Sequence, residues 1–151
     1  MNMIDETVEI DGVAFQFIGE PQESGLSVRC VPQDQRYLPL CGVVETAWRY
    51  SPVRLLNSAR ERHGQSFEGE ISFGYYEDYP DELEPGVTVD YLGEELVVSE
   101  EMFRRFVVKF AMFHLRATRE LLPGRGTDAA LLPLLAPLQS NDEEDKEPSS
   151  R

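Results

Sequence analysis

The stretch from Ser99 to Pro123 constrains the fold of this chain most, because it is typical of one long amphipathic helix. Ser99 is a good N-cap, two glutamates follow in the first turn, where the helix dipole favours anions, and arginines come late, where it favours cations. The apolar residues recur at three- and four-residue spacing and are Phe103, Phe106, Val107, Phe110, Phe113, His114, Ala117 and Leu121. Such a stripe packs on a sheet, so the remaining residues must supply one.

Most of the preceding chain alternates apolar and polar residues in short runs that are typical of strands. Asp11-Gly12 favours a type I′ turn between two of these runs, and Gly93-Glu94 turns the chain between two others. In the central run, Phe67, Ile71, Phe73 and Tyr75 point to one side. We expect strands over 8–10, 13–17, 26–30, 67–76, 87–91 and 96–98.

Shorter helices are predicted between and after the strands. Ser51-Pro52 offers an N-cap followed by proline at the first helical position, and Gly64 suits a C-terminal stop, which together predict a helix over 52–63. Residues 41–50 suit either a short helix or a strand. The leucine-rich segment 127–138 should add one or two helical turns.

These elements predict an α+β fold, in which an antiparallel sheet packs against the long C-terminal helix and one or two shorter helices. At 151 residues the chain fits one domain and needs no metal or disulfide to fold. We expect that domain over 1–138. The polar, acidic string over 139–151 is typical of a disordered end.

The net charge of −14 narrows the classes of partner. Fourteen Lys and Arg stand against 28 Asp and Glu, a balance that repels phosphate backbones and anionic lipid, so we expect neither nucleic acid nor membrane as a partner. No run approaches the roughly 20 apolar residues of a membrane span, and no signal peptide is evident. Cys30 and Cys41 lack CxxC spacing, and we expect a cytoplasmic protein with both thiols reduced.

Between Phe67 and Glu101 the chain has twelve acidic residues and no Lys or Arg. They are Glu68, Glu70, Glu77, Asp78, Asp81, Glu82, Glu84, Asp90, Glu94, Glu95, Glu100 and Glu101. Tyr75, Tyr76 and Tyr79 are interleaved with them and could add contact area. Carboxylates this close repel one another, so we interpret the block as the binding surface for a basic partner. The alternative is a solvated face paired internally with the arginines of the long helix.

Sites for chemistry are not evident in the sequence. His63 falls at a predicted helix end and His114 on an apolar stripe, and neither has metal-ligand spacing. A calcium site in the run from Glu77 to Gly86 is a lesser alternative, because that run lacks the D-x-D-x-D-G order of ligands. We therefore expect no enzyme, no metal and no cofactor; a deep cleft with a perturbed acid-base pair would instead favour a small-molecule hydrolase or transferase.

Three motifs follow one another in the second half of the chain. They are F-E-G-x-x-x-F-G-Y-Y-E-D (Phe67 to Asp78), G-V-T-V-D (Gly86 to Asp90) and L-V-V-S-x-x-x-F (Leu96 to Phe103). In this order, the stretch from Phe67 to Leu122 resembles the ribonuclease-toxin immunity proteins of bacterial contact-dependent inhibition and related polymorphic toxin systems. The resemblance covers a little over a third of the chain.

The resemblance implies a cytoplasmic antidote, a monomer or weak dimer, that binds the toxic C-terminal nuclease domain of a delivered effector and occludes its basic active-site cleft. It implies contacts at Glu68, Glu70, Tyr75, Tyr76, Glu77 and Asp78, of which Glu68, Glu70 and Tyr76 should share one side of a strand while Tyr75 points inward. The acidic loop adds Tyr79, Asp81, Glu82 and Glu84 as candidate contacts. The alternative function is an acidic adaptor or chaperone for a basic client protein of a secretion or phage-related system.

Overall fold

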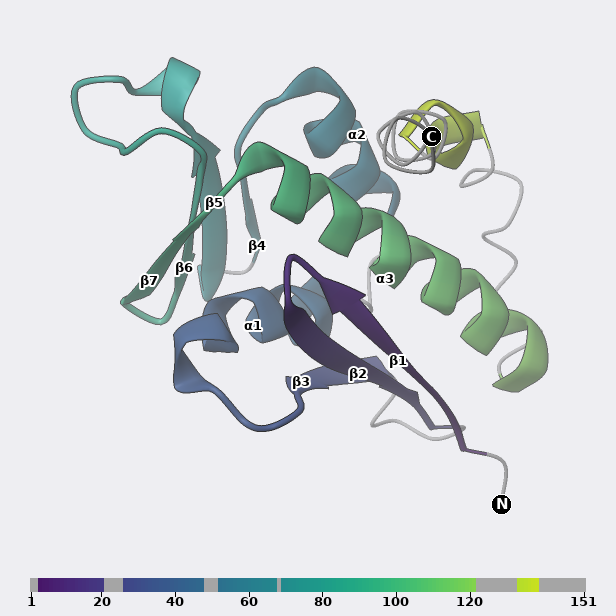
Figure 1. Ribbon diagram of the computed structural model, residues 1–151. Helices are drawn as coiled ribbons and strands as arrows, with labels where there is room; N and C mark the ends of the chain where they lie inside the picture. Colours follow the sequence, from purple (N-terminus) through teal and green to yellow (C-terminus); the bar gives the residue numbers. More distant parts are fainter. Residues whose placement is uncertain (1–2, 21–25, 48–51, 68, 122–132, 139–151) are drawn as a thin grey trace, which may run out of the picture.

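The strands form two separate antiparallel sheets (Figure 1) in a computed structural model that describes residues 3–20, 26–47, 52–67, 69–121 and 133–138. Sheet A has the order β1 (Ile4–Ile10), β2 (Val13–Gly19), β3 (Leu26–Cys30). Sheet B has the order β4 (Gln65–Phe67), β5 (Ile71–Tyr75), β6 (Val87–Tyr91), β7 (Glu94–Val98). The α+β class is confirmed, whereas the single sheet that we expected is divided in two.

Helix α1 (Leu38–Ala47) joins the two sheets. It follows a 3₁₀ turn, η1 (Gln35–Tyr37), whose N-cap Asp34 accepts a hydrogen bond from the Arg36 amide at 3.0 Å. The segment was ambiguous in sequence, and it is helical because Leu40, Val43 and Val44 recur at helical spacing and are fully buried. Since α1 packs against both β3 and β6, the two sheets share one core.

Helix α2 (Val53–Glu61) confirms the helix predicted over 52–63, but it does not end at Gly64 as expected. Arg62 takes the left-handed conformation instead, with φ 59°, and caps the helix. Gly64 serves a different purpose: a Cβ atom there would lie 2.5 Å from the carbonyl oxygen of Phe73. The glycine therefore lets the chain that enters β4 approach β5 closely.

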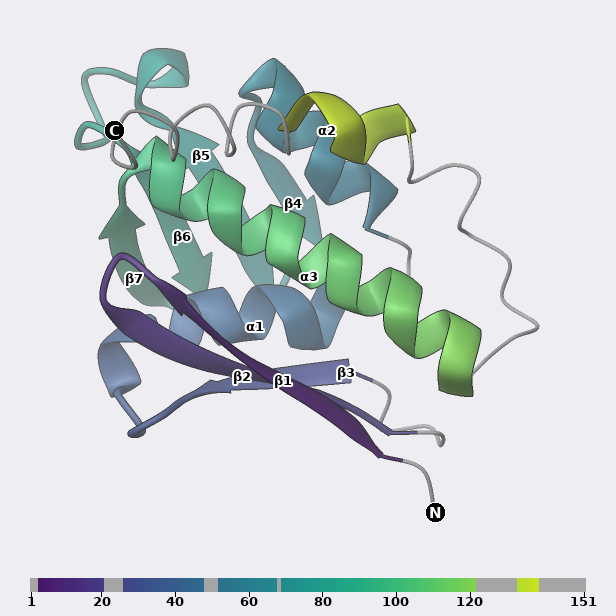
Figure 2. The same ribbon diagram turned by 45° about the vertical axis from the view of Figure 1, so that its right-hand side comes forward.

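Helix α3 (Glu100–Leu121) confirms the long amphipathic helix, and the Ser99 hydroxyl accepts a hydrogen bond from the Met102 amide at 3.0 Å, as an N-cap does. It runs diagonally across the molecule beside sheet A and α2 (Figures 1 and 2). A further helical segment over 133–138 agrees with part of the expected turn over 127–138, and Arg104 donates a hydrogen bond to its Leu138 carbonyl at 3.1 Å. The predictions for residues 127–132 and 139–151 fall outside the described residues.

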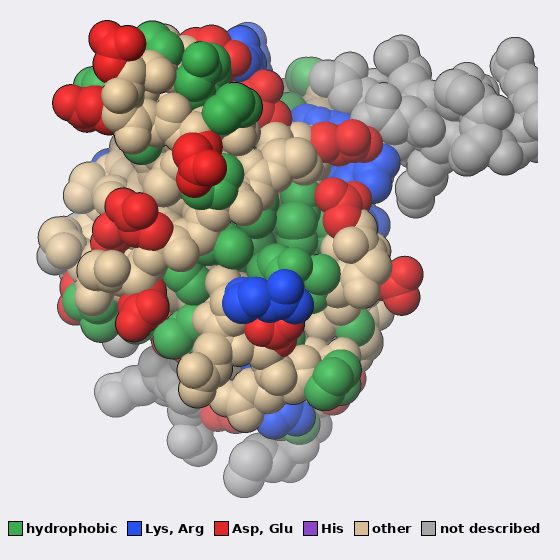
Figure 3. Space-filling view, turned by 60° about the vertical axis from the view of Figure 1, so that its left-hand side comes forward, with side chains coloured by type: hydrophobic (Ala, Val, Ile, Leu, Met, Phe, Trp, Pro, Cys, Tyr) green, Lys and Arg blue, Asp and Glu red, His purple; other side chains and the backbone are tan. Residues whose placement is uncertain are grey.

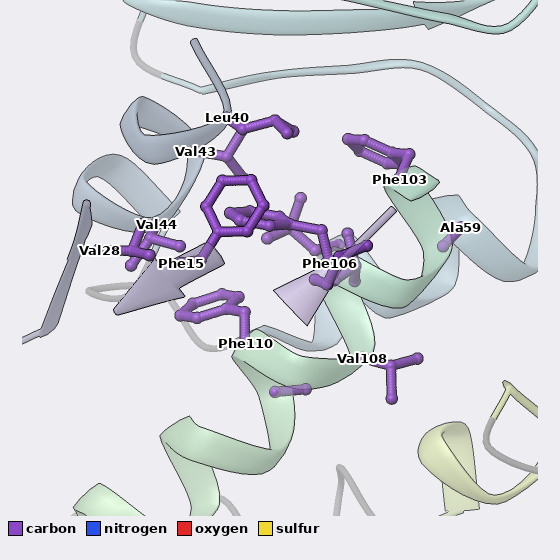
Figure 4. Close-up of a cluster of buried hydrophobic side chains, with 14 of the residues drawn as sticks. Phe15, Val28, Leu40, Val43, Val44, Ala59, Phe103, Phe106, Val108 and Phe110 are labelled. Atoms are coloured by element: carbon purple, nitrogen blue, oxygen red, sulfur yellow. The ribbon is translucent and has the colours of Figure 1, made fainter. Parts of the chain in front are cut away.

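The aromatic stripe of α3 fills the space between the sheets (Figure 4). Near its start, the Phe103 ring lies 4.8 Å from that of Phe73 in sheet B. One turn later, the Phe106 ring lies 5.1 Å from Phe15 and 5.8 Å from Phe17 in sheet A. Each contact is an aromatic pair of ordinary geometry, so one stripe of the helix packs on both sheets.

Replacing Phe106 with alanine should lower the free energy of unfolding by about 3–5 kcal/mol, because the ring is fully buried against sheet A and its loss leaves a cavity. Chemical denaturation followed by circular dichroism measures the change. Met112→Ala is the matched control on the same helix, since Met112 is 38% exposed, and it should change stability by less than about 0.5 kcal/mol. Equal losses in the two variants would contradict this assignment of the core.

Candidate functional site

The β5–β6 loop carries the first group of acidic side chains, which we call the loop cluster. Its members are Glu77, Asp78, Asp81, Glu82 and Glu84, and all of them are exposed. The loop starts with a 3₁₀ turn, η2 (Tyr76–Asp78), and projects from one end of sheet B (Figure 1).

Backbone hydrogen bonds hold the loop in one shape. Tyr76 donates to the Gly86 carbonyl at 3.1 Å, which closes the loop at its base, and Leu83 donates to the Tyr79 carbonyl at 2.9 Å. Gly86 has a φ of 113°, and a Cβ atom there would lie 2.3 Å from the Val98 oxygen, so glycine is required at this point. The carboxylates are therefore mounted on an ordered backbone.

A second group, the turn cluster, lies at the opposite end of sheet B. It consists of Glu70, Asp90, Glu94 and Glu95. Asp90 is paired with Glu95 in the β6–β7 register, and the Leu92 amide donates to the Glu70 carbonyl at 2.9 Å, which brings the two turns side by side. Strands of five residues separate the two clusters, a span of about 15 Å.

This separation corrects the expectation that Glu68, Glu70 and Tyr76 share one side of a strand. Glu70 precedes β5 and Tyr76 follows it, so the two residues belong to different clusters. Glu68 lies outside the described residues. The run over 67–76 was expected to be one strand, but β4 ends at Phe67 and β5 begins at Ile71, so Glu70 lies in the turn between them.

Arginines of the same chain neutralise part of the acidic block. Arg62 contacts both Glu77 and Glu100 at 2.6 Å, and the hydrogen bonds that it donates, the one to Glu100 first, raise the pKa of its guanidinium above the usual range. Arg105 contacts Glu101 at 2.6 Å. These three carboxylates are thus paired internally, but only Glu101 is paired with an arginine of the long helix, as the alternative interpretation expected.

The other acidic residues of the block have no Lys or Arg partner in the described part of the chain. They are Glu70, Asp78, Asp81, Glu82, Glu84, Asp90, Glu94 and Glu95. Figure 3 shows red carboxylates over the projecting loop and along the adjacent flank of sheet B, while blue side chains gather elsewhere on that face. Most of the acidic charge of sheet B is therefore uncompensated.

The three candidate tyrosines differ in their exposure. Tyr75 is 3% exposed and packs edge-to-face on Phe103, and burial raises the pKa of its hydroxyl, so its side chain does not reach a partner surface. The inward orientation of Tyr75 is thus confirmed and its place among the contacts is wrong. Tyr79 is 57% exposed at the tip of η2, and Tyr76 is half-buried beside it.

Two hollows lie near the end of α2, and one of them borders the loop cluster. One, of about 530 Å³, is lined by His63, Gln65, Ser66, Asp78 and Tyr79 among others. In it His63 Nδ1 lies 4.0 Å from Asp78 Oδ1, too far for the hydrogen bond that would orient an acid-base pair. The other, of about 380 Å³, lies beside the Arg62 ion pairs and Tyr75. Within the described ranges, no group of three or more His, Cys, Asp or Glu side chains could hold a metal ion.

Sequence reasoning missed Arg62, which is exposed and lies in no recognised motif. Its role comes from the left-handed conformation, which turns its side chain from the end of α2 toward both the loop and the start of α3. The signal that could have indicated it is weak: one arginine just before a histidine and a glycine, at the end of a predicted helix.

Comparisons of the chain with protein-family models, with curated proteins and with solved structures find no match. None of the helices that the structure describes is long and apolar enough to cross a membrane. The residues themselves must therefore carry the functional argument.

Replacing Arg62 with glutamine should loosen the β5–β6 loop, because the guanidinium joins the loop to α2 and α3. Hydrogen exchange followed by mass spectrometry should show several-fold faster exchange at the Tyr79 and Leu83 amides, which are bonded within the loop. Arg29→Gln is the control, since Arg29 bonds only across sheet A to Gln16 among the described residues. Unchanged hydrogen exchange in the Arg62 variant would contradict the role of Arg62 in holding the loop.

Both cysteines should resist thiol reagents until the protein unfolds. Cys30 and Cys41 are buried where β3 meets α1, and burial raises the pKa of the Cys41 thiol to about 12 and that of Cys30 above its usual value. A higher pKa leaves less of the reactive thiolate at pH 8. Reaction with a chromogenic disulfide at pH 8 should be slow in buffer and fast in guanidinium chloride; two rapidly reacting thiols in the native protein would contradict the burial.

Proposed function

We propose that this chain is an immunity protein: a cytoplasmic, non-catalytic antidote that binds a basic nuclease toxin domain and occludes its active-site cleft. The observation that supports it most is the set of exposed carboxylates on sheet B that lack a basic partner among the described residues. A toxin that handles RNA or DNA presents cationic side chains to phosphates, and carboxylates on an ordered scaffold can occupy the same positions.

Charge repulsion among these carboxylates favours the binding of a cationic partner. Carboxylates gathered at each end of sheet B repel one another in the free protein, and a cationic partner relieves that repulsion on binding. Complementary fields of this kind raise association rates by roughly 10- to 1,000-fold at low salt. A fast-acting antidote benefits from such steering, because a nuclease does damage for as long as it remains unbound.

Tyr79 supports binding beyond electrostatic steering. Its side chain is 57% exposed between Asp78 and Asp81 on the loop, and a tyrosine in such a place supplies contact area at low entropic cost. The half-buried Tyr76 and the hydrogen-bonded loop backbone keep it in position. The loop thus combines a central aromatic with surrounding carboxylates, an arrangement suited to a protein interface.

The test is co-expression with the protein encoded immediately upstream, followed by co-purification at rising salt. The triple variant Asp81→Lys, Glu82→Lys, Glu84→Lys reverses exposed charges that have no arginine partner. It should reduce the association rate at low salt by at least about tenfold and remove protection from growth arrest. Thermal unfolding should change little, since none of the three side chains is buried.

The matched control reverses three exposed acids elsewhere, Asp5, Glu9 and Glu61, and so changes the net charge equally. It should bind at a nearly native rate at physiological salt, because screening limits the reach of charge to about 8 Å. Unaltered protection by the loop variant would contradict the proposed surface. An upstream protein that co-purifies yet is harmless when expressed alone would indicate an adaptor or chaperone for a basic client instead.

A further inference from the structure

The four outer strands of the two sheets differ in their side-chain contacts: β3 and β7 both pack against α1, whereas β1 and β4 have side-chain ion pairs or hydrogen bonds to other elements. Along β1, Arg116 reaches Glu6 from α3, and next to it Arg105 reaches Asp11 at 3.5 Å. Strand β3 packs against α1, and β4 is three residues long with Arg54 donating to the Gln65 side chain at 2.9 Å. Among the described residues, no side chain of β7 has a hydrogen bond or an ion pair.

The hairpin between β6 and β7 determines which backbone groups of β7 are open. Leu92 and Gly93 have φ values of 52° and 89°, as in a two-residue type I′ turn, and the Asp90 side chain accepts from the Gly93 amide at 3.0 Å. In such a hairpin Tyr91 and Glu94 form the first hydrogen-bonded pair, and the bonding pairs then alternate along the ladder. Glu95 and Val97 consequently direct their N–H and C=O groups away from β6.

This edge has two glutamates but lacks the other features that usually protect an edge strand. The pairing of β7 with β6 is continuous from Glu94 to Val98, without a bulge, and the strand has no proline and no lysine. Val97 is 37% exposed, and Leu92 in the adjoining turn is 65% exposed. The strand therefore offers unpaired backbone groups together with apolar contact.

Charge at the same edge selects one kind of occupant. Glu95 lies opposite Asp90 on the outer face of the sheet, with Glu94 and Glu70 nearby, and none has a Lys or Arg partner in the described part of the chain. A second copy of this chain would bring further carboxylates to this place, which like-charge repulsion disfavours. A basic strand would be attracted.

Strand β7 runs from the turn cluster to the base of the loop cluster. Glu94 belongs to the turn cluster, while Val98 is paired with Val87 and contacts Gly86 at the base of the loop cluster. A strand laid along β7 would therefore extend from one cluster to the other, over the same span of about 15 Å. The two groups of carboxylates would then act on the two ends of one bound segment.

We propose that β7 is a docking edge, where an extended basic segment of the protein partner adds to sheet B as a fifth strand, antiparallel to β7. The segment has an apolar residue opposite Val97 and, two positions later, a Lys or Arg opposite Glu95, since these two positions share one face. This inference rests on the proposed function and specifies the surface through which binding occurs.

The probe is an acetylated, amidated peptide, STVTKTK in one-letter code, whose valine would lie opposite Val97 and whose first lysine opposite Glu95. Titration of the ¹⁵N-labelled protein should shift the Glu95 and Val97 amides in NMR spectra and slow their hydrogen exchange. N-methylation at the valine and first lysine removes the donors that face β7, and should weaken binding at least about tenfold. N-methylation at the last two threonines, whose N–H groups face away, should leave binding nearly unchanged.

Two protein variants complete the test. Val97→Pro removes an N–H that β6 does not use, so the fold is retained while peptide binding falls at least about tenfold. Glu95→Lys should favour STVTETE over STVTKTK. Any of three results would contradict the docking edge. The two N-methylated peptides bind equally, Val97→Pro binds the peptide as tightly as the native protein does, or millimolar peptide leaves the Glu95 and Val97 amides unshifted.

The upstream protein separates this inference from the proposed function. If Val97→Pro binds it with native affinity while the loop-cluster triple variant does not, the docking edge fails and the immunity function stands. If the native chain does not bind the upstream protein, the proposed function fails, and the peptide titration still decides whether β7 accepts a strand. Weak binding by Val97→Pro together with native binding by the control at Asp5, Glu9 and Glu61 supports both.

Discussion

The rest of the structure depends on the contact between one aromatic stripe and two sheets. Phe103 packs on Phe73 in sheet B, and Phe106 and Phe113 pack on Phe17 in sheet A. Neither sheet can bury its apolar face alone, because the face of a sheet must be covered by another element. Because α3 is held on both sides, its first residues have a defined position, and the acidic block is arranged around that position.

Arg62 shows how this packing limits the acidic surface. The start of α3 places Glu100 beside the end of α2, where Arg62 contacts it and Glu77 together. The fold thus neutralises the carboxylates closest to the junction of three elements and leaves those on the projecting loop uncompensated. This distribution has a physical logic, since charges at a packed junction repel at short range, whereas charges on a loop are screened by solvent.

Much of the fold was predictable where the signal is local. The Ser99 cap, the stripe of α3 and the inward side of Phe67, Ile71, Phe73 and Tyr75 follow from spacing, and burial bears them out. The division into two sheets was not predictable, because it depends on which distant strands pair. Segment 41–50 was ambiguous for a similar reason: its β-branched residues suit a strand, and only packing against both sheets makes residues 41–47 part of a helix.

The candidate surface was predictable in content but not in layout. A count of charges located the acidic block, and the tyrosines interleaved with it included the exposed Tyr79. The block nevertheless joined residues that the hairpins send to opposite ends of sheet B, and the candidate contacts included Tyr75, whose side chain points inward as expected. Left-handed Arg62 has no signature in composition or in periodicity.

The positions of the two clusters favour a partner that binds through an extended segment. At physiological salt a charge acts over about 8 Å, so clusters about 15 Å apart attract independently, and a compact basic patch could satisfy one of them only. An extended segment along β7 satisfies both, because this strand starts in one cluster and ends at the base of the other. Electrostatic attraction would then bring the partner to the sheet, and the open backbone groups of Glu95 and Val97 would determine which segment of it binds.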